Sequence, residues 1–150
     1  MFWCCKNLET IDLSNFNTSK VTILESMFSG CENLYSVNLT SFDTKNVNDI
    51  SQIFWDCKKL LIVDLSSFDT SNATNMNSMF NNCESLTYVD ISNFKLDKAI
   101  DISFFFKGCI NLCYVSLPIE EIHNHESINK NHMFLDCINL PKDIVEISLE

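Results

Sequence analysis

The chain has no arginine: its ten basic residues are all lysine, against 20 aspartate and glutamate residues, and the formal net charge is -10. A surface this acidic repels a polyanion, which argues against DNA or RNA as a partner. Glycine and proline are almost as scarce, with two residues each in 150. Two scattered glycines cannot form a glycine-rich phosphate loop. Because both glycine and proline are scarce, the turns must be built from Asn, Asp and Ser.

Long apolar runs are missing as well. No stretch approaches the roughly 18 apolar residues of a membrane-spanning helix, and no basic segment followed by an apolar stretch opens the chain. The sequence therefore predicts no membrane span in this segment and shows no targeting signal. Apolar residues still make up 46% of the 150 residues. This is enough for one folded core and the length is too short for several.

What the sequence does contain is an internal repeat. Its starts lie 26 residues apart, and a final step of 28 closes the series: Met1, Met27, Ile53, Met79, Phe105 and Met133. A cysteine follows four residues after each start: Cys5, Cys31, Cys57, Cys83, Cys109 and Cys137. We expect one repeat domain over residues 1–150, with coils starting near residues 1, 27, 53, 79 and 105 and a degenerate unit at 133–150. We also expect it to be part of a longer chain.

Within each repeat the spacing of apolar residues changes. Val37 and Leu39 alternate with polar residues, as in a short strand with one buried face. Further along the next coil, Ala73, Met76 and Met79 lie three residues apart and continue to Phe80. This is the pattern of an apolar stripe on a helix. Each repeat therefore predicts a strand, a turn and a short helix.

Two further positions mark the ends of the expected helix. Gly30 and Gly108 fall one residue before the cysteine, where later coils have other types that tolerate positive φ. These are Asp56, Asn82 and Asp136. We expect the helix to end there in a left-handed residue, with Cys4 as the exception in the first coil. Threonines before the helical stripe are expected to cap its N–H groups. They are Thr18, Thr44 and Thr70.

One such unit cannot bury its apolar face alone, whereas stacked units bury equivalent residues against one another. The sequence therefore predicts an α/β fold: a right-handed solenoid with a parallel β-sheet on one face, within residues 9–117, and a short helix per 26-residue repeat. Residues 118–132 lose the turn and the helical stripe, so we expect them to be re-formed or looped. The charged segment after Pro141 is expected to form a final edge strand.

The run Leu34-x-x-Val37-x-Leu39-x-x-Phe42 resembles the strand segment of leucine-rich repeats, with Phe in place of the usual Asn or Cys. The phrases "MFSGCENLYSVNLTSFDTKNVNDIS" and "MFNNCESLTYVDISNF" are similar to the BspA-like leucine-rich repeats of bacterial and protozoan surface proteins. The similarity is strong over residues 1–117 and weak beyond. It implies a leucine-rich-repeat-like solenoid in a non-enzymatic extracellular or cell-surface protein, often linked to adhesion or host-protein binding. It fixes no ligand.

The cysteine column is the most conspicuous chemical feature. Neighbouring members of a stacked column lie about 5 Å apart with parallel Cβ vectors, which suits a disulfide poorly because its dihedral is close to perpendicular. We therefore interpret the six cysteines as buried, reduced thiols that act as small apolar side chains, with disulfides or metal binding as the alternatives. Cys4 and Cys113 lie outside the column.

The other candidate metal ligands gather in the aberrant coil. They are His123, His125 and His132, with Glu120, Glu121 and Glu126. Structural zinc sites usually carry tighter, cysteine-bearing signatures, so we interpret these as surface histidines, with a zinc site as the alternative. No nucleophile elbow or unique carboxylate pair occurs, and we expect no enzymatic activity, no catalytic residue and no cofactor.

Strand residues that point away from the expected core form columns across the coils. One column contains Thr10, Ser36, Ile62, Tyr88 and Tyr114. The next contains Asp12, Asn38, Asp64, Asp90 and Ser116. Exposed tyrosines beside fixed charges are typical anchors of protein interfaces. We therefore predict a ligand-binding face at Ile62, Tyr88, Tyr114, Asp64 and Asp90, with Ca²⁺ bound between the two aspartates as the alternative.

The favoured function is a protein-binding or adhesion module at a cell surface or outside the cell, with a protein partner such as a host or cell-surface protein. Two alternatives stay open. The solenoid can be a structural spacer that holds another part of the protein away from a surface, or an intracellular protein-interaction repeat.

Overall fold

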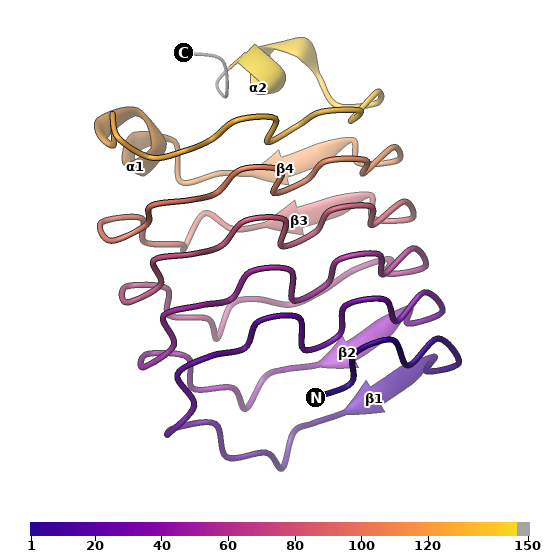
Figure 1. Ribbon diagram of the computed structural model, residues 1–150. Helices are drawn as coiled ribbons and strands as arrows, with labels where there is room; N and C mark the ends of the chain where they lie inside the picture. The colour runs from indigo at the N-terminus through magenta and orange to yellow at the C-terminus, as the bar shows by residue number, and fades with distance from the viewer. Residues whose placement is uncertain (147–150) are drawn as a thin grey trace.

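The computed structural model describes residues 1–146. Figure 1 shows successive coils of the chain stacked one above the other, with short strands along one side. The strands are β1 (Thr10–Asp12), β2 (Ser36–Asn38), β3 (Tyr88–Asp90) and β4 (Tyr114–Ser116). Two helices, α1 (Ile119–Asn124) and α2 (Lys142–Glu146), lie at the C-terminal end of the stack.

The strands pair in parallel with the register of the repeat. Ile11 lies opposite Val37 in the pair of β1 and β2, and Val89 lies opposite Val115 in the pair of β3 and β4. The prediction of parallel strands in successive coils is confirmed for these four. It is wrong for the third coil, because residues 61–65 form no strand and the sheet is divided into two pairs.

The predicted helix in each repeat is also wrong. On this side of the coil the chain makes a succession of turns, and its N–H groups donate to carbonyl oxygens of the next coil instead of to its own fourth residue back. The N–H groups of Leu24, Ser26 and Phe28 donate to residues 49, 51 and 53 at 2.8, 3.0 and 2.9 Å. Parallel bridges link the coils here, from Ile23 to Asp49 and onward to residue 129. Bonding between coils has replaced bonding within a helix.

Left-handed residues explain why no helix forms. The expected column of positive φ is confirmed from Gly30 (73°) to Asp136 (66°), and Cys4, the exception by residue type, also has a positive φ of 56°. A second column, four residues earlier and missed from the sequence, also has φ between 54° and 58°: Ser26, Gln52, Ser78, Phe104 and His132. Two left-handed residues per coil turn the chain away from the right-handed helical path, so a regular α-helix cannot continue through them.

The threonine that recurs at the same repeat position in three coils has a different role from the predicted helix cap. The Oγ1 of Thr44 donates to the carbonyl of Asp69 at 3.0 Å and accepts from the N–H of Asp69 at 2.7 Å. Thr18 and Thr70 make the same pair of bonds to Asp43 and Lys95. Each buried hydroxyl therefore joins its coil to the next one.

Replacing Thr44 by valine is expected to lower the free energy of unfolding by about 1 to 3 kcal/mol, because the substitution keeps the shape but leaves a part-buried N–H and a carbonyl without their partner. Urea unfolding followed by circular dichroism measures the change. Thr22→Val is the matched control, since Thr22 is exposed. An equal loss in both variants would mean that exchanging a hydroxyl for a methyl group at these positions, not the bond between coils, causes the destabilisation.

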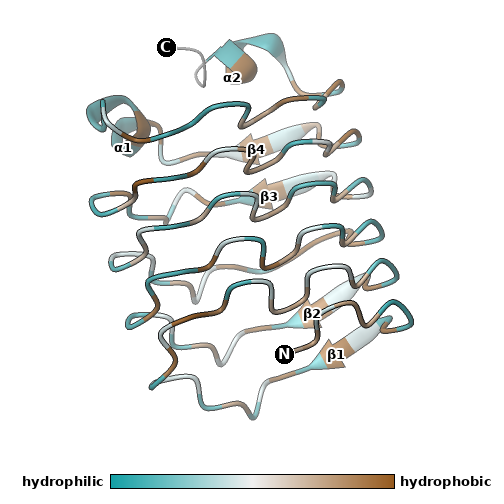
Figure 2. Ribbon diagram, viewed as in Figure 1, coloured by the Kyte–Doolittle hydropathy of each residue, from teal (hydrophilic) through white to brown (hydrophobic). Residues whose placement is uncertain are grey.

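Identical side chains stack through the core, as the repeat predicts. A continuous series of phenylalanine rings has centroid separations of 5.4 to 5.6 Å. Its members are Phe2, Phe28, Phe54, Phe80, Phe106 and Phe134. Leucines seven residues after each start are buried in the same way from Leu34 onward. Figure 2 shows apolar residues recurring in every coil, while α1 is largely hydrophilic.

The C-terminal end departs from the repeat. Residues 118–132 are re-formed, as expected, and contain α1, which buries Ile122. The Oε2 of Glu121 accepts from the N–H of Leu96 at 3.2 Å, at the place where a threonine joins the earlier coils. The expected final strand is wrong for residues 142–146, which form α2, and its remainder at 147–150 lies outside the described residues. Within residues 1–146, neither helix has the length and apolar character to cross a membrane.

Candidate functional site

The predicted apolar column does face solvent. Ile62, Tyr88 and Tyr114 are 61%, 40% and 58% exposed, while Val63 and Val89 beside them point into the core. The rings of Tyr88 and Tyr114 stack at 5.6 Å with an interplanar angle of 11°. Stacking holds both rings in fixed orientations on adjacent strands, so they present one aromatic surface to the solvent.

Sequence reasoning missed two large exposed residues that directly precede column members in the sequence. Tyr35 and Leu61 are 43% and 53% exposed and stand one position before the predicted column. Each immediately precedes the outward-facing strand position of its coil, and the N–H of Leu61 donates to the carbonyl of Tyr35 at 3.5 Å. The sequence signal that could have found them is their own repeat position, which is occupied by Glu9, Tyr35, Leu61, Thr87 and Cys113.

The two aspartates of the predicted site close turns. The N–H of Ser66 donates to Oδ1 of Asp64 at 2.9 Å, and the N–H and Oγ of Ser92 donate to Oδ1 of Asp90 at 2.9 and 2.7 Å. These bonds lower the pKa of both carboxyl groups, chiefly through the backbone N–H of Ser66 for Asp64 and the hydroxyl of Ser92 for Asp90. Both groups are therefore ionised and fixed in direction at neutral pH. Among residues 1–146, no salt bridge includes either of them.

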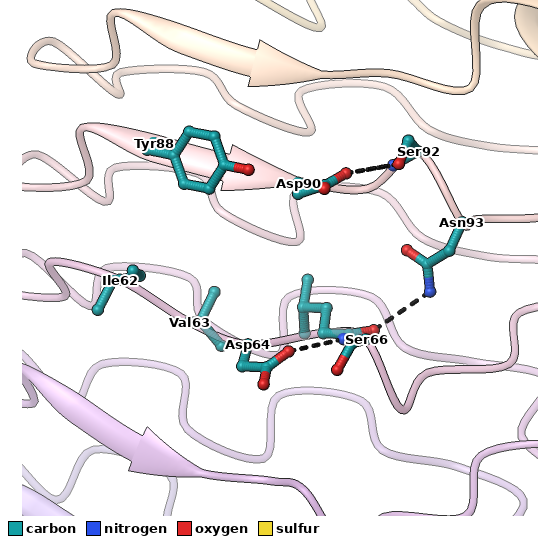
Figure 3. A pocket seen from close by; sticks show the side chains of 9 residues that line it. Ile62, Val63, Asp64, Ser66, Tyr88, Asp90, Ser92 and Asn93 are labelled. Atoms are coloured by element: carbon teal, nitrogen blue, oxygen red, sulfur yellow. Dashed lines mark hydrogen bonds between the residues drawn. The ribbon is translucent and has the colours of Figure 1, made fainter.

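A hollow of about 460 Å³ lies between coils three and four, and we call it the coil-three pocket. Its lining residues come from two neighbouring segments: Ile62, Val63, Asp64, Leu65 and Ser66, with Tyr88, Asp90, Ser92 and Asn93. Figure 3 shows the two segments on either side, with Ile62 and Tyr88 at one end and Asn93 at the other. The structure thus brings four of the five predicted site residues to one hollow, and Tyr114 stacks on its rim.

The pocket exists because the sheet is interrupted. In the described part of the chain, the main-chain groups of residues 62–64 make no hydrogen bond to β2 or β3. At the end of the pocket, the Nδ2 of Asn93 donates to the carbonyls of Leu65 and Phe68 at 3.3 and 3.2 Å. Ser41 and Ser67 make the equivalent bridge between the earlier coils with a shorter side chain.

The three histidines are not gathered into one site. His123 and His125 line a hollow beside α1 with Ile122, Glu126 and Lys130, whereas His132 packs against the ring of Phe104 at 5.2 Å. Over residues 1–146, no group of three His, Cys, Asp or Glu side chains is placed to hold a metal ion, either here or around Asp64 and Asp90.

Five of the six column cysteines are buried, as predicted, but Cys5 in the first coil is exposed. Each buried thiol donates to a carbonyl of the preceding coil, as Cys57 does to Phe28 at 3.2 Å and Cys83 to Phe54 at 3.1 Å. Burial raises the pKa of Cys31 to about 11 and that of Cys57, Cys83 and Cys109 further. A nucleophilic cysteine needs a lowered pKa, so these thiols serve the packing of the coils.

Comparison with known proteins gives a consistent fold. The sequence model of a family described as "Mycoplasma protein of unknown function, DUF285" matches residues 1–87 and 37–147. A leucine-rich-repeat protein of T. pallidum has a similar structure, with a TM-score of 0.60 and 20% identity over 99% of this chain and 72% of that one. A leucine-rich cell surface protein of Faecalibacterium prausnitzii A2-165 has a TM-score of 0.52 and 18% identity over 89% of this chain and 41% of that one. No curated protein matches significantly. These likenesses show a leucine-rich-repeat-like fold.

Proposed function

We propose that this chain, which belongs to the DUF285 family, is a non-enzymatic protein-binding module of a cell-surface or secreted protein. In this proposal the stacked coils form a rigid right-handed solenoid of the BspA-like kind, and its strand side contacts a partner protein in adhesion. The surface setting is supported by the description of one structural neighbour as a cell surface protein. No nucleic acid and no cofactor take part.

The observation that carries the proposal is the stacked pair of Tyr88 and Tyr114 beside Ile62. Large side chains are costly to leave in water, and this column holds small hydroxyl residues in the first two coils, Thr10 and Ser36. Rigid aromatic side chains lose little conformational entropy when a partner covers them, so they contribute much of the affinity at protein interfaces.

Replacing Tyr88 and Tyr114 together by alanine is expected to weaken binding at least about tenfold, because truncated aromatic anchors commonly cost 2 kcal/mol or more. Surface plasmon resonance against a panel of purified extracellular proteins identifies the partner and measures the loss. Thr10→Ala with Ser36→Ala is the matched control, since both residues occupy the same column. Circular dichroism checks that both variants stay folded.

A spacer is the second candidate, supported by the continuous bonding between coils that makes the stack stiff. The same experiment separates the two functions. Unchanged binding in the tyrosine variant, or equal losses in both variants, would move the site away from this face. If no protein of the panel bound, the spacer would be favoured.

A further inference from the structure

We infer that the coil-three pocket is the anchor point of the face, and that it takes a segment of the partner that presents an aliphatic side chain beside a lysine or arginine. This inference rests on the proposed function, because it names the chemistry of what binds to the same face. Two properties of the pocket support it: its apolar wall and its acidic rim.

The apolar wall selects an aliphatic side chain. Val63 and Leu65 form the inner wall and are nearly fully buried, while Ile62 and Tyr88 stand at the mouth and are exposed. The volume of about 460 Å³ lies in the range of roughly 300 to 1,000 Å³ that is typical of ligand pockets. A side chain entering between Ile62 and Tyr88 therefore removes apolar surface of both from water.

The acidic rim selects a cation next to that side chain. Asp64 and Asp90 lie on adjacent coils at the same repeat position, and the pocket lining includes no lysine. Their turn-closing bonds hold the carboxylates in place, so a partner's ammonium or guanidinium meets a preorganised pair of charges. The net charge of -10 attracts a basic segment over longer distances. An anionic ligand, a phosphate above all, is disfavoured for the same reason.

Asp→Asn substitution tests the charge without disturbing the turn. The second coil already has Asn38 at this position, and its Oδ1 accepts from the N–H of Thr40 at 3.1 Å in the same manner. The variant with Asp64→Asn and Asp90→Asn therefore loses two charges but keeps the acceptor atoms. Asp12→Asn is the matched control, because Asp12 makes the same bond to Ser14 in the first coil, away from the pocket.

The probes are three blocked octapeptides: Gly-Ser-Leu-Lys-Leu-Lys-Ser-Gly, the same peptide with Ser for each Leu, and the same peptide with Glu for each Lys. Each is titrated against the ¹⁵N-labelled chain while amide shifts are recorded by NMR. The Leu-Lys peptide is expected to shift Val63, Leu65 and Ser92, and to bind at least about tenfold more tightly than either other peptide. The double Asp→Asn variant should lose that advantage, while Asp12→Asn should keep it.

Several results would overturn the inference. Equal binding of the Ser-Lys peptide would mean that charge alone acts, and an equal loss in Asp12→Asn would mean a general field effect. Shifts at the same amides with an oligomer of glucose, but none with the Leu-Lys peptide, would assign the pocket to a sugar. Shifts at Tyr114 without shifts at Val63 and Leu65 would exclude the pocket while retaining the face. The proposed function is decided separately, by the two-tyrosine variant and its own partner.

Discussion

Phe80→Ala is expected to lower the free energy of unfolding by about 3 to 5 kcal/mol, the usual cost of deleting a fully buried phenylalanine ring. Phe80 is 0% exposed and stacks on Phe54 at 5.4 Å and on Phe106 at 5.6 Å. It also touches Phe105 at 5.9 Å. Removing the ring therefore leaves a cavity between three coils, and a total stability of about 5 to 15 kcal/mol makes this loss a large one.

The position of Phe80 in the stack adds to this cost. In a repeat protein the stability is close to a sum of unit terms and nearest-neighbour terms, so a central substitution weakens two interfaces and a terminal one weakens a single interface. Within residues 1–146 Phe134 stacks on the single ring of Phe106, and Phe134→Ala should therefore cost less than Phe80→Ala. Urea unfolding of both variants, with Phe16→Ala as an exposed control, measures the difference. Equal costs at Phe80 and Phe134 would contradict a nearest-neighbour core.

The register and the buried columns could be predicted because a repeat of fixed length forces equivalent residues into contact. When Cys31, Cys57 and Cys83 recur 26 residues apart, stacking places each against the next, and the alternation around Val37 and Val89 tells which side faces inward. The same logic placed Ile62, Tyr88 and Tyr114 on the solvent side. The prediction of burial is wrong for Cys5, since no preceding coil covers its thiol within the described residues.

The sequence alone could not exclude a helix, because two different structures share the same spacing of apolar residues. Apolar residues three and four apart mark one face of a helix, and they also mark successive turns whose N–H groups bond to the next coil. The helix and the turns differ in the left-handed residues Ser26, Gln52 and Phe104, and these residue types are not typical of a positive φ. The bonds between coils stabilise these conformations, and they exist only after stacking.

The coil-three pocket was hidden for a related reason. Residues 61–65 have as strong a strand pattern as any in the chain, yet pairing depends on how the coils before and after lie. The one local signal is Asn93, whose longer side chain spans the coils where Ser41 and Ser67 do so elsewhere. The change from Ser to Asn in this repeat column therefore marks the place of the pocket. The chemistry of the site was predicted from the outward-facing strand residues alone.

The second large effect is expected on raising the pH. In the folded chain, burial raises the pKa of Cys57, Cys83 and Cys109 far above the value of about 8.5 to 9 that these thiols have when unfolded. The folded state therefore keeps protons that the unfolded state loses. The stability from these thiols is complete below the unfolded pKa and falls as the pH rises above it. Each contributes a loss of about 1.4 kcal/mol per pH unit there.

Three central thiols together are expected to remove about 4 kcal/mol between neutral pH and pH 10, which is a large share of a stability of about 5 to 15 kcal/mol. Urea unfolding at half-unit steps from pH 7 to 10.5, with a phosphine reductant present, measures the slope. A thiol count in denaturant without reductant should find eight free thiols. Fewer would show that the column is cross-linked.

The slope can be assigned to the buried thiols by two single variants. Cys83→Ala removes one buried thiol and should reduce the slope by about 1.4 kcal/mol per pH unit above pH 9. Cys113→Ala removes an exposed thiol that lies outside the buried column and should leave the slope unchanged. Lysines and tyrosines on the surface contribute alike to all three proteins and cancel in the comparison. If Cys83→Ala kept the full slope, ionisation of other groups would drive alkaline unfolding, and the raised pKa of the column would have no part in it.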